Sequence, residues 1–244
     1  MTEIDWLIGS ATTAIAFLYS SVGHAGASGY IALLALTGTA AEDLRSSALM
    51  LNILVSLVTS VLFLRSGHWS ARLFFPSALA SVPLAAVGGM ITLPATLLHT
   101  LIGLVLVYSA FMFIIRPREA EQISEPPLPI LLVLGGAIGL LSGMIGVGGG
   151  IFLTPLLISL RWSTTKTAAG VSSLFILLNS LSGLAGVAYG GGVHLSPQLP
   201  VMAVSTLVGG SIGATMGSGH FSVITLKRIL AAVLMLAGGK LILL

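Results

Sequence analysis

Long apolar runs separated by short polar stretches dominate the sequence. Most runs continue for about 20 residues, the length that an α-helix needs to cross the hydrocarbon core of a bilayer. They lack the alternation of apolar and polar positions that the strands of a membrane β-barrel require. The pattern therefore predicts an all-α polytopic membrane protein of eight to ten membrane segments. The predicted apolar segments are residues 4–22, 30–36, 44–64, 73–93, 96–115, 128–145, 151–160, 167–189, 200–216 and 224–244.

Composition supports this class, because 56% of the 244 residues are hydrophobic and only 7% are charged. A soluble domain carries about 25% charged residues, so the lipid bilayer is the expected partner of this surface. No cysteine is present, which excludes disulfides and thiolate metal sites. The formal net charge of +3 comes from basic residues scattered among loops, so no nucleic-acid partner is expected. Glu3 and Asp5 stand where a cleavable signal would be basic, so none is expected.

Two glycine-rich stretches interrupt the apolar runs about 126 residues apart. The first reads V-G-H-A-G-A-S-G over residues 22–29, and the second reads I-G-V-G-G-G over residues 145–150. Unwound backbone is tolerated at membrane depth only where protein or water surrounds it. In transporters, such breaks at corresponding positions of two halves point to the substrate site.

The two halves match elsewhere as well. Ser46 and Asn52 align with Ser173 and Asn179, on the segment that follows each break. This predicts an N-terminal repeat of residues 1–115, a cytoplasmic linker of residues 116–127 and a C-terminal repeat of residues 128–244. Each repeat has five apolar segments, and together they form one transport domain. Whether each break lies in a full helix pair or in a shallower re-entrant hairpin is left open.

The basic residues predict the orientation, because loops rich in Lys and Arg stay in the cytoplasm. Two loop regions without Lys or Arg, near Pro94 and over residues 190–197, are expected outside, as are both termini. With these loops assigned to the two sides, each repeat crosses the membrane a net odd number of times. The two repeats are therefore predicted to be inverted relative to each other. Arg45 and Lys240 do not fit the rule. The basic residues expected inside are Arg65, Arg72, Arg116, Arg118, Arg161, Lys166, Lys227 and Arg228.

No Asp, Glu, Lys or Arg falls squarely within an apolar segment, so an anion would have to be held by dipoles. A helix N-terminus carries roughly half a positive charge and presents free N–H groups. His24 is the titratable group expected to lie deep, and its ordinary pKa of about 6.5 suits proton coupling or anion contact. Hydrogen bonding between helices is an equally good reading of the serines and asparagines. The candidate substrate-binding residues are Gly23, His24, Gly26, Ser28, Gly146, Gly148, Gly149, Gly150, Asn52 and Asn179.

An enzyme is not expected. The G-A-S-G of residues 26–29 is similar to the G-x-S-G of rhomboid intramembrane serine proteases, which would make Ser28 a nucleophile. Its candidate histidine partners, His68 and His99, fall at helix ends, and the second half has no matching serine. His24 has no companion ligand nearby in the sequence, so neither a metal nor another cofactor is expected.

The second break resembles the sulfite exporter TauE/SafE family of membrane transporters. Gly146, Gly148, Gly149, Gly150 and Pro155 follow that family's G-x-G-G-G-x-x-x-x-P pattern, whereas the first break departs from it. The resemblance implies secondary transport of small sulfur-containing anions, such as sulfite, thiosulfate or organosulfonates, across the bacterial inner membrane. Alternating access between the two halves is the expected mechanism, with an anion channel as the alternative. A homo-oligomer is one expectation for the assembly.

Overall fold

The computed structural model describes residues 3–91, 94–115 and 123–219, together with scattered positions between 222 and 239. Regular structure in this described part is entirely helical, which confirms the all-α class, and its bounds match the predicted segments within a few residues. Linker residues 116–122 and most of the predicted last segment lie outside the described residues. The helices are α1 (Glu3–Ser21), α2 (Ala27–Leu36), α3 (Ala41–Arg65), α4 (Ala71–Met90), α5 (Ala95–Ile115), α6 (Leu128–Ile145), α7 (Gly150–Ser159), α8 (Thr165–Gly190) and α9 (Leu199–Gly219).

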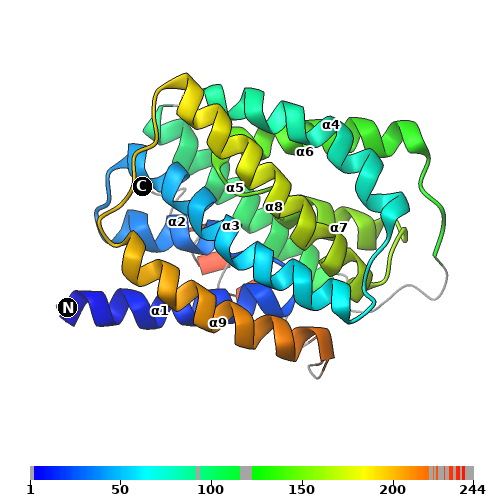
Figure 1. Cartoon of the computed structure of the whole chain (residues 1–244), viewed down its shortest axis with the longest axis horizontal. Coiled ribbons are helices and arrows are strands. Elements are labelled where there is room, and N and C mark those ends of the chain that lie inside the picture. Colours follow the sequence, from blue (N-terminus) through cyan, green and yellow to red (C-terminus); the bar gives the residue numbers. More distant parts are fainter. Residues whose placement is uncertain are drawn as a thin grey trace.

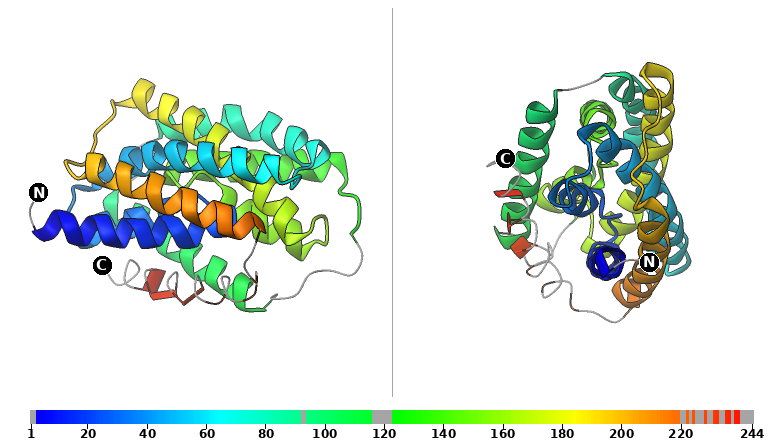
Figure 2. Two further views of the ribbon diagram at one scale, coloured as in Figure 1. Left: turned by 60° about the horizontal axis from the view of Figure 1, so that its bottom comes forward. Right: turned by 90° about the vertical axis from the view of Figure 1, so that its left-hand side faces the viewer.

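The helices form two packed layers, with α5 lying outside them (Figure 2). The first layer has the order α4, α8, α3 and α9, each helix packed against the next. The second layer lies on the first helix by helix, with α6 against α4, α7 against α8, α2 against α3 and α1 against α9. The short helices α2 and α7 therefore occupy the middle of the bundle.

The two layers are built from two copies of one arrangement. The contacts between the copies occur in matching pairs. Helix α1 of the first copy packs on α9 of the second, as α6 of the second packs on α4 of the first, and α3 packs on α9 as α8 packs on α4. In Figure 1, α3 runs from left to right, whereas its counterpart α8 runs from right to left. Equivalent helices thus point in opposite directions, which is the predicted inverted repeat.

Five of the described helices, α3, α4, α6, α8 and α9, are long and apolar enough to cross a membrane. Large apolar side chains remain exposed on these helices, among them Leu79, Val133 and Val204. In water, continuous apolar patches of this kind would cause the protein to associate. In a bilayer they contact lipid tails, which are themselves apolar. The outer surface is therefore that of a multi-pass membrane protein.

The helices that follow the two breaks are short. α2 and α7 have ten residues each, which corresponds to about 15 Å of helix, half of a hydrocarbon core of about 30 Å. Because α1 and α3 run in the same direction in Figure 1, α2 must bring the chain back between them. Of the two arrangements left open by the sequence, a full helix pair or a shallower re-entrant hairpin, the structure has a full-length helix before each break and a short return helix after it.

Rows of glycine bring the layers together. In a membrane, where hydrophobic burial does not drive helices together, small residues let backbones approach closely. In both rows, ideal Cβ positions lie about 2 Å from carbonyl oxygens of the facing helix. The two helix pairs are therefore in direct backbone contact. The rows are Gly135, Gly139 and Gly143 of α6 on Ser77, Ser81 and Ala85 of α4, and Gly209, Gly213 and Gly217 of α9 on Thr13, Phe17 and Ser21 of α1.

Two basic side chains near the starts of α3 and α8 bond to carbonyl groups at helix ends. Arg45 donates to the carbonyl oxygens of Gly89 at 3.0 Å and Ile91 at 2.6 Å, at the end of α4. Lys166 donates to the carbonyl oxygen of Ser218 at 3.1 Å, at the end of α9. A cation at a helix C-terminus compensates the negative end of the dipole. This local role explains why Arg45 does not follow the loop-charge rule.

We expect Gly139→Ala to lower the free energy of unfolding by about 1–3 kcal/mol, because a Cβ there would lie 2.2 Å from the carbonyl oxygen of Ser81. This loss should exceed the gain of about 1 kcal/mol in helix propensity. The control is Gly136→Ala in the same helix, where the nearest atom is the end of the flexible Leu84 side chain at 3.0 Å. Thermal unfolding in detergent measures both, and equal melting temperatures would contradict the packing role of the row.

Candidate functional site

The first break lies between α1 and α2 and is buried throughout. Residues 21–30 are all shielded from the surface. Gly26, the residue before α2, has φ of 101°, a left-handed conformation that favours glycine. Gly23 lies so close to α8 that a Cβ would fall 2.3 Å from that of Ala169. The unwound backbone is therefore enclosed by protein, as membrane depth requires.

The second break, between α6 and α7, has the same construction. Gly149 precedes α7 with φ of 82°, and its ideal Cβ position lies 2.8 Å from the ring of Phe175. Gly146 lies against α3, where a Cβ would fall 2.7 Å from Cγ of Arg45. The contact of Gly146 with Arg45 and that of Gly23 with Ala169 are thus equivalent contacts of the two repeats.

The two breaks meet at one small cavity. Its volume is about 10 Å³, which is roughly the room for a single water molecule. The cavity is smaller than a sulfur oxyanion, so the two halves would have to move apart at the junction before such an anion could bind. Its lining combines Tyr19, His24, Ala25, Gly26, Ala27 and Ser28 from the first repeat with Val147, Ile151 and Ile176 from the second.

Buried hydrogen bonds hold the first break in shape. Nδ1–H of His24 donates to the carbonyl oxygen of Val22 at 3.1 Å, which places a proton on that nitrogen. The hydroxyl of Tyr30 donates to the carbonyl oxygen of Ala25 at 2.8 Å. Both bonds satisfy carbonyl groups that the interrupted helix leaves without helical donors.

Ser28, the candidate nucleophile of the protease alternative, lies in this cavity. Its hydroxyl oxygen is 2.9 Å from the phenol oxygen of Tyr19, and both side chains are buried. A phenol, with an ordinary pKa of about 10, is a poor general base near neutral pH. The pair is therefore better suited to positioning than to nucleophilic attack.

Helices α2 and α7 both begin at the cavity, since Gly26, Ala27 and Ile151 belong to its lining. The first N–H groups of a helix have no acceptor within the helix, and the dipole adds partial positive charge at that end. None of the buried side chains in the described part of the chain is acidic. The junction thus presents N–H donors and positive potential, which favours an anion.

The two candidate asparagines differ in their surroundings. Nδ2 of Asn179 donates to the carbonyl oxygen of Phe175 at 2.8 Å, and its Oδ1 accepts from the hydroxyl of Ser81 at 2.5 Å. Asn52 instead lies beside Gly148 of the second break. Asn179 therefore connects α8 with α4, whereas Asn52 faces the junction of the two halves.

The sequence alignment that paired these asparagines also differs from the packing. Arg45 and Ala169, which hold equivalent places beside the two breaks, are 124 residues apart. The same offset matches Asn52 with Ile176, so the two asparagines are not symmetry mates.

A charged group comes closer to the second break than the sequence suggested. Arg45 lies near the start of α3, and the packing brings its side chain against Gly146 of that break. Arg45 is half-buried, and its guanidinium also approaches the carbonyl oxygen of Met144 near the end of α6, at 3.4 Å. The negative ends of α4 and α6 are thereby compensated next to Gly146.

Several residues of the junction were not identified from the sequence. Tyr19 and Tyr30 are fully buried, and a tyrosine within an apolar run needs a polar partner, which is a signal that could have found them. Ser180 follows the more conspicuous Asn179 and has no sequence signal of its own. Val147 and Ile176 line the cavity as ordinary apolar residues.

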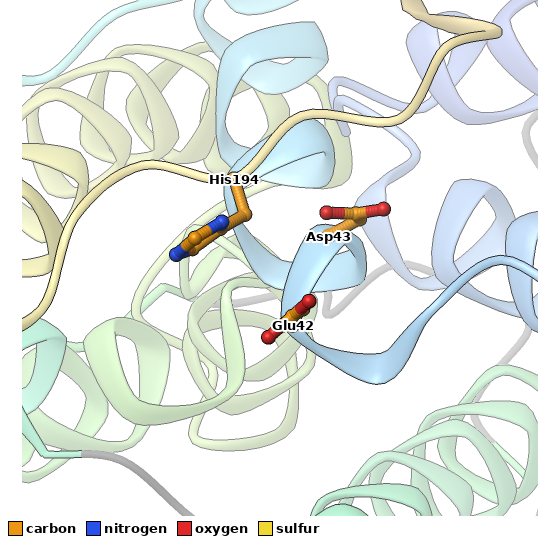
Figure 3. A group of neighbouring side chains, drawn as sticks. All are labelled: Glu42, Asp43 and His194. Carbon is orange, nitrogen blue, oxygen red and sulfur yellow. The ribbon is translucent and has the colours of Figure 1, made fainter.

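A cluster of titratable residues lies elsewhere, at the start of α3. Glu42 and Asp43 lie beside His194 of the loop before α9, with their ligand atoms within 4.8 Å of one another (Figure 3). Glu42 and His194 are exposed and Asp43 is half-buried. Exposed groups of this kind often gather without binding a metal ion, so the cluster is not part of the candidate site.

Comparison with known proteins agrees with this architecture. The profile of the sulfite exporter TauE/SafE family matches residues 8–241. The chain is also 37% identical over 233 residues to the probable membrane transporter protein y4hK of Sinorhizobium fredii, covering 93% of this chain and 94% of that protein. No solved structure matches the sequence. The chain therefore belongs to the sulfite exporter TauE/SafE family and is a membrane transporter.

Proposed function

We propose that the chain is a secondary transporter of small sulfur-containing anions, of the sulfite, thiosulfate or organosulfonate class. It would work in the bacterial inner membrane with both termini outside. The two inverted repeats would rock against each other and expose the junction of the breaks to each side in turn. The family description supports the substrate class, because it names sulfite.

The meeting of two helix N-termini at one buried cavity is the observation that carries this proposal. α2 comes from one repeat and α7 from the inverted copy, so their partial positive charges approach the cavity from opposite directions. An oxyanion is stabilised by such donors without a full positive charge. A cation would be repelled by both helix ends, so the geometry favours anions as a class.

The small volume of the cavity favours a carrier over the alternative of an anion channel. A conducting channel needs a continuous path, whereas room for about one water molecule at the junction suits a state occluded between two open forms. Binding would then require that the repeats separate at the breaks. Saturation and counterflow are the kinetic properties that distinguish this behaviour from channel conduction.

Reconstituted protein should take up radiolabelled thiosulfate or sulfite into proteoliposomes, with saturation and with counterflow driven by unlabelled anion inside. Sulfate and chloride serve as competing anions that test selectivity. Uptake of none of the sulfur anions would overturn the proposed substrate class. Uptake without saturation or counterflow would replace the carrier by a channel.

Gly149→Val should abolish thiosulfate uptake while the protein still inserts into the membrane. The new side chain would meet Phe175 and Ile138 within 3 Å and would hold a strained φ at the start of α7. Gly38→Val is the matched control, because Gly38 has φ of 79° but open space around its Cβ position. Uptake by the Gly149 variant at the wild-type rate would contradict a site at the second break.

His24→Ala should flatten the pH dependence of uptake more than it lowers thermal stability. Imidazole is the side chain that changes charge between about pH 5 and pH 8, and His24 is buried at the cavity. A protonated ring would favour the bound anion, so wild-type uptake should rise as the pH falls through this range. His194→Ala, at the exposed loop, is the control. An unchanged profile for the His24 variant would exclude the coupling role.

A further inference from the structure

Asn52 has an unusual environment for a buried amide. Its side chain is fully buried, yet neither Nδ2 nor Oδ1 has a hydrogen-bond partner within the described residues. The hydroxyl of Ser180 is also fully buried and equally unpartnered. Several other buried hydroxyls also lack a hydrogen-bond partner. Among the side-chain amides in the described part of the chain, Asn52 is the one that lacks a partner. Buried polar groups are normally paired, so an unpaired amide needs an explanation.

Both polar groups face the same glycine. The ideal Cβ position of Gly148 lies 2.8 Å from Nδ2 of Asn52 and 2.9 Å from Oγ of Ser180. Any side chain at residue 148 would fill this space. The glycine therefore leaves two unpaired polar groups, one from α3 and one from α8, directed at the backbone of the second break.

The packing places this pair beside the cavity. Ile176, one turn before Ser180 on α8, lines the cavity and packs with Ala25 of the first break and Val55 of α3. Val55 lies three residues after Asn52 on α3. Helix α8 therefore carries both Ile176 at the cavity and Ser180 at Gly148, while Val55 places α3 in the same apolar cluster as Ile176 and Ala25.

The electrostatic surroundings decide which charge would be accepted. Arg45 compensates the carbonyl ends of α4 and α6, while α7 begins at Gly150 with its positive end at the break. No acidic side chain is among the buried residues that the structure describes. An amide N–H and a hydroxyl both donate, so the pair is suited to the oxygen of an anion.

We infer that Nδ2 of Asn52 and Oγ of Ser180 donate hydrogen bonds to an oxygen of the transported oxyanion at Gly148. This assignment rests on the proposed function and specifies its polar contacts. One donor belongs to each repeat, so the anion joins the two halves, and substrates must carry an unprotonated oxygen. When the repeats separate, the anion reaches the pair from the small cavity.

The test compares Asn52→Ala and Ser180→Ala with Ser182→Ala, in thermal shift and equilibrium binding with potassium thiosulfate and potassium sulfite. Asn52 and Ser180 lose no side-chain hydrogen bond to a described residue, so both variants should keep or raise the melting temperature without added anion. Their affinity for thiosulfate should fall at least tenfold. Ser182→Ala breaks the bond from its hydroxyl to the carbonyl oxygen of Val82 on α4, so it should lower the melting temperature and leave the affinity within about twofold.

Asn52→Asp tests the sign of the charge. An added carboxylate should weaken thiosulfate binding beyond the alanine variant, because it replaces a donor by a negative charge. Binding of sodium or potassium by the wild-type protein that is lost in Asn52→Ala would overturn the assignment in favour of a cation site. Wild-type affinity in both Asn52→Ala and Ser180→Ala would also overturn it, while the proposed function would stand. A wild-type protein that neither binds nor transports any of the sulfur anions would instead refute the proposed function.

Discussion

Backbone polar groups inside a bilayer have no water to bond to, and this constraint shapes the whole molecule. An intact helix satisfies it internally, whereas a broken helix leaves N–H and C=O groups that lipid cannot satisfy. Here two helices are broken, and the chain between α1 and α2 is buried at every residue from 21 to 30. The second layer, with short helices at its centre and long ones around them, keeps both breaks away from lipid. The breaks are thus stable only because the two repeats cover them jointly.

The same constraint explains how charge is distributed. Carbonyl groups at the ends of α4 and α9 face Arg45 and Lys166, which compensate the negative ends of these helices. Near the junction, by contrast, helix N-termini meet at the cavity while buried acidic side chains are absent from the described residues. The junction therefore keeps a positive potential that no described side chain compensates.

The sequence predicts the fold well because its strongest signals are local. Apolar runs define the helices, and the glycines at 146, 148, 149 and 150 mark the second break without reference to any distant residue. Contacts between distant residues were not accessible in this way. Arg45 bonds to carbonyl groups 44 and 46 residues away, and no local pattern encodes this. Asn52 and Asn179 look alike in sequence, but only packing distinguishes the amide bonded to Ser81 from the one that faces Gly148.

The central claim is that both breaks together hold one anion. A cryo-electron-microscopy map of the protein in lipid nanodiscs with bound thiosulfate tests it most directly, since the two sulfur atoms scatter strongly. The account predicts anion density between Gly26 and Gly149, in contact with the first turns of both α2 and α7. Density at a site that touches only one repeat, or continuous helices through residues 22–29 and 145–150, would contradict it.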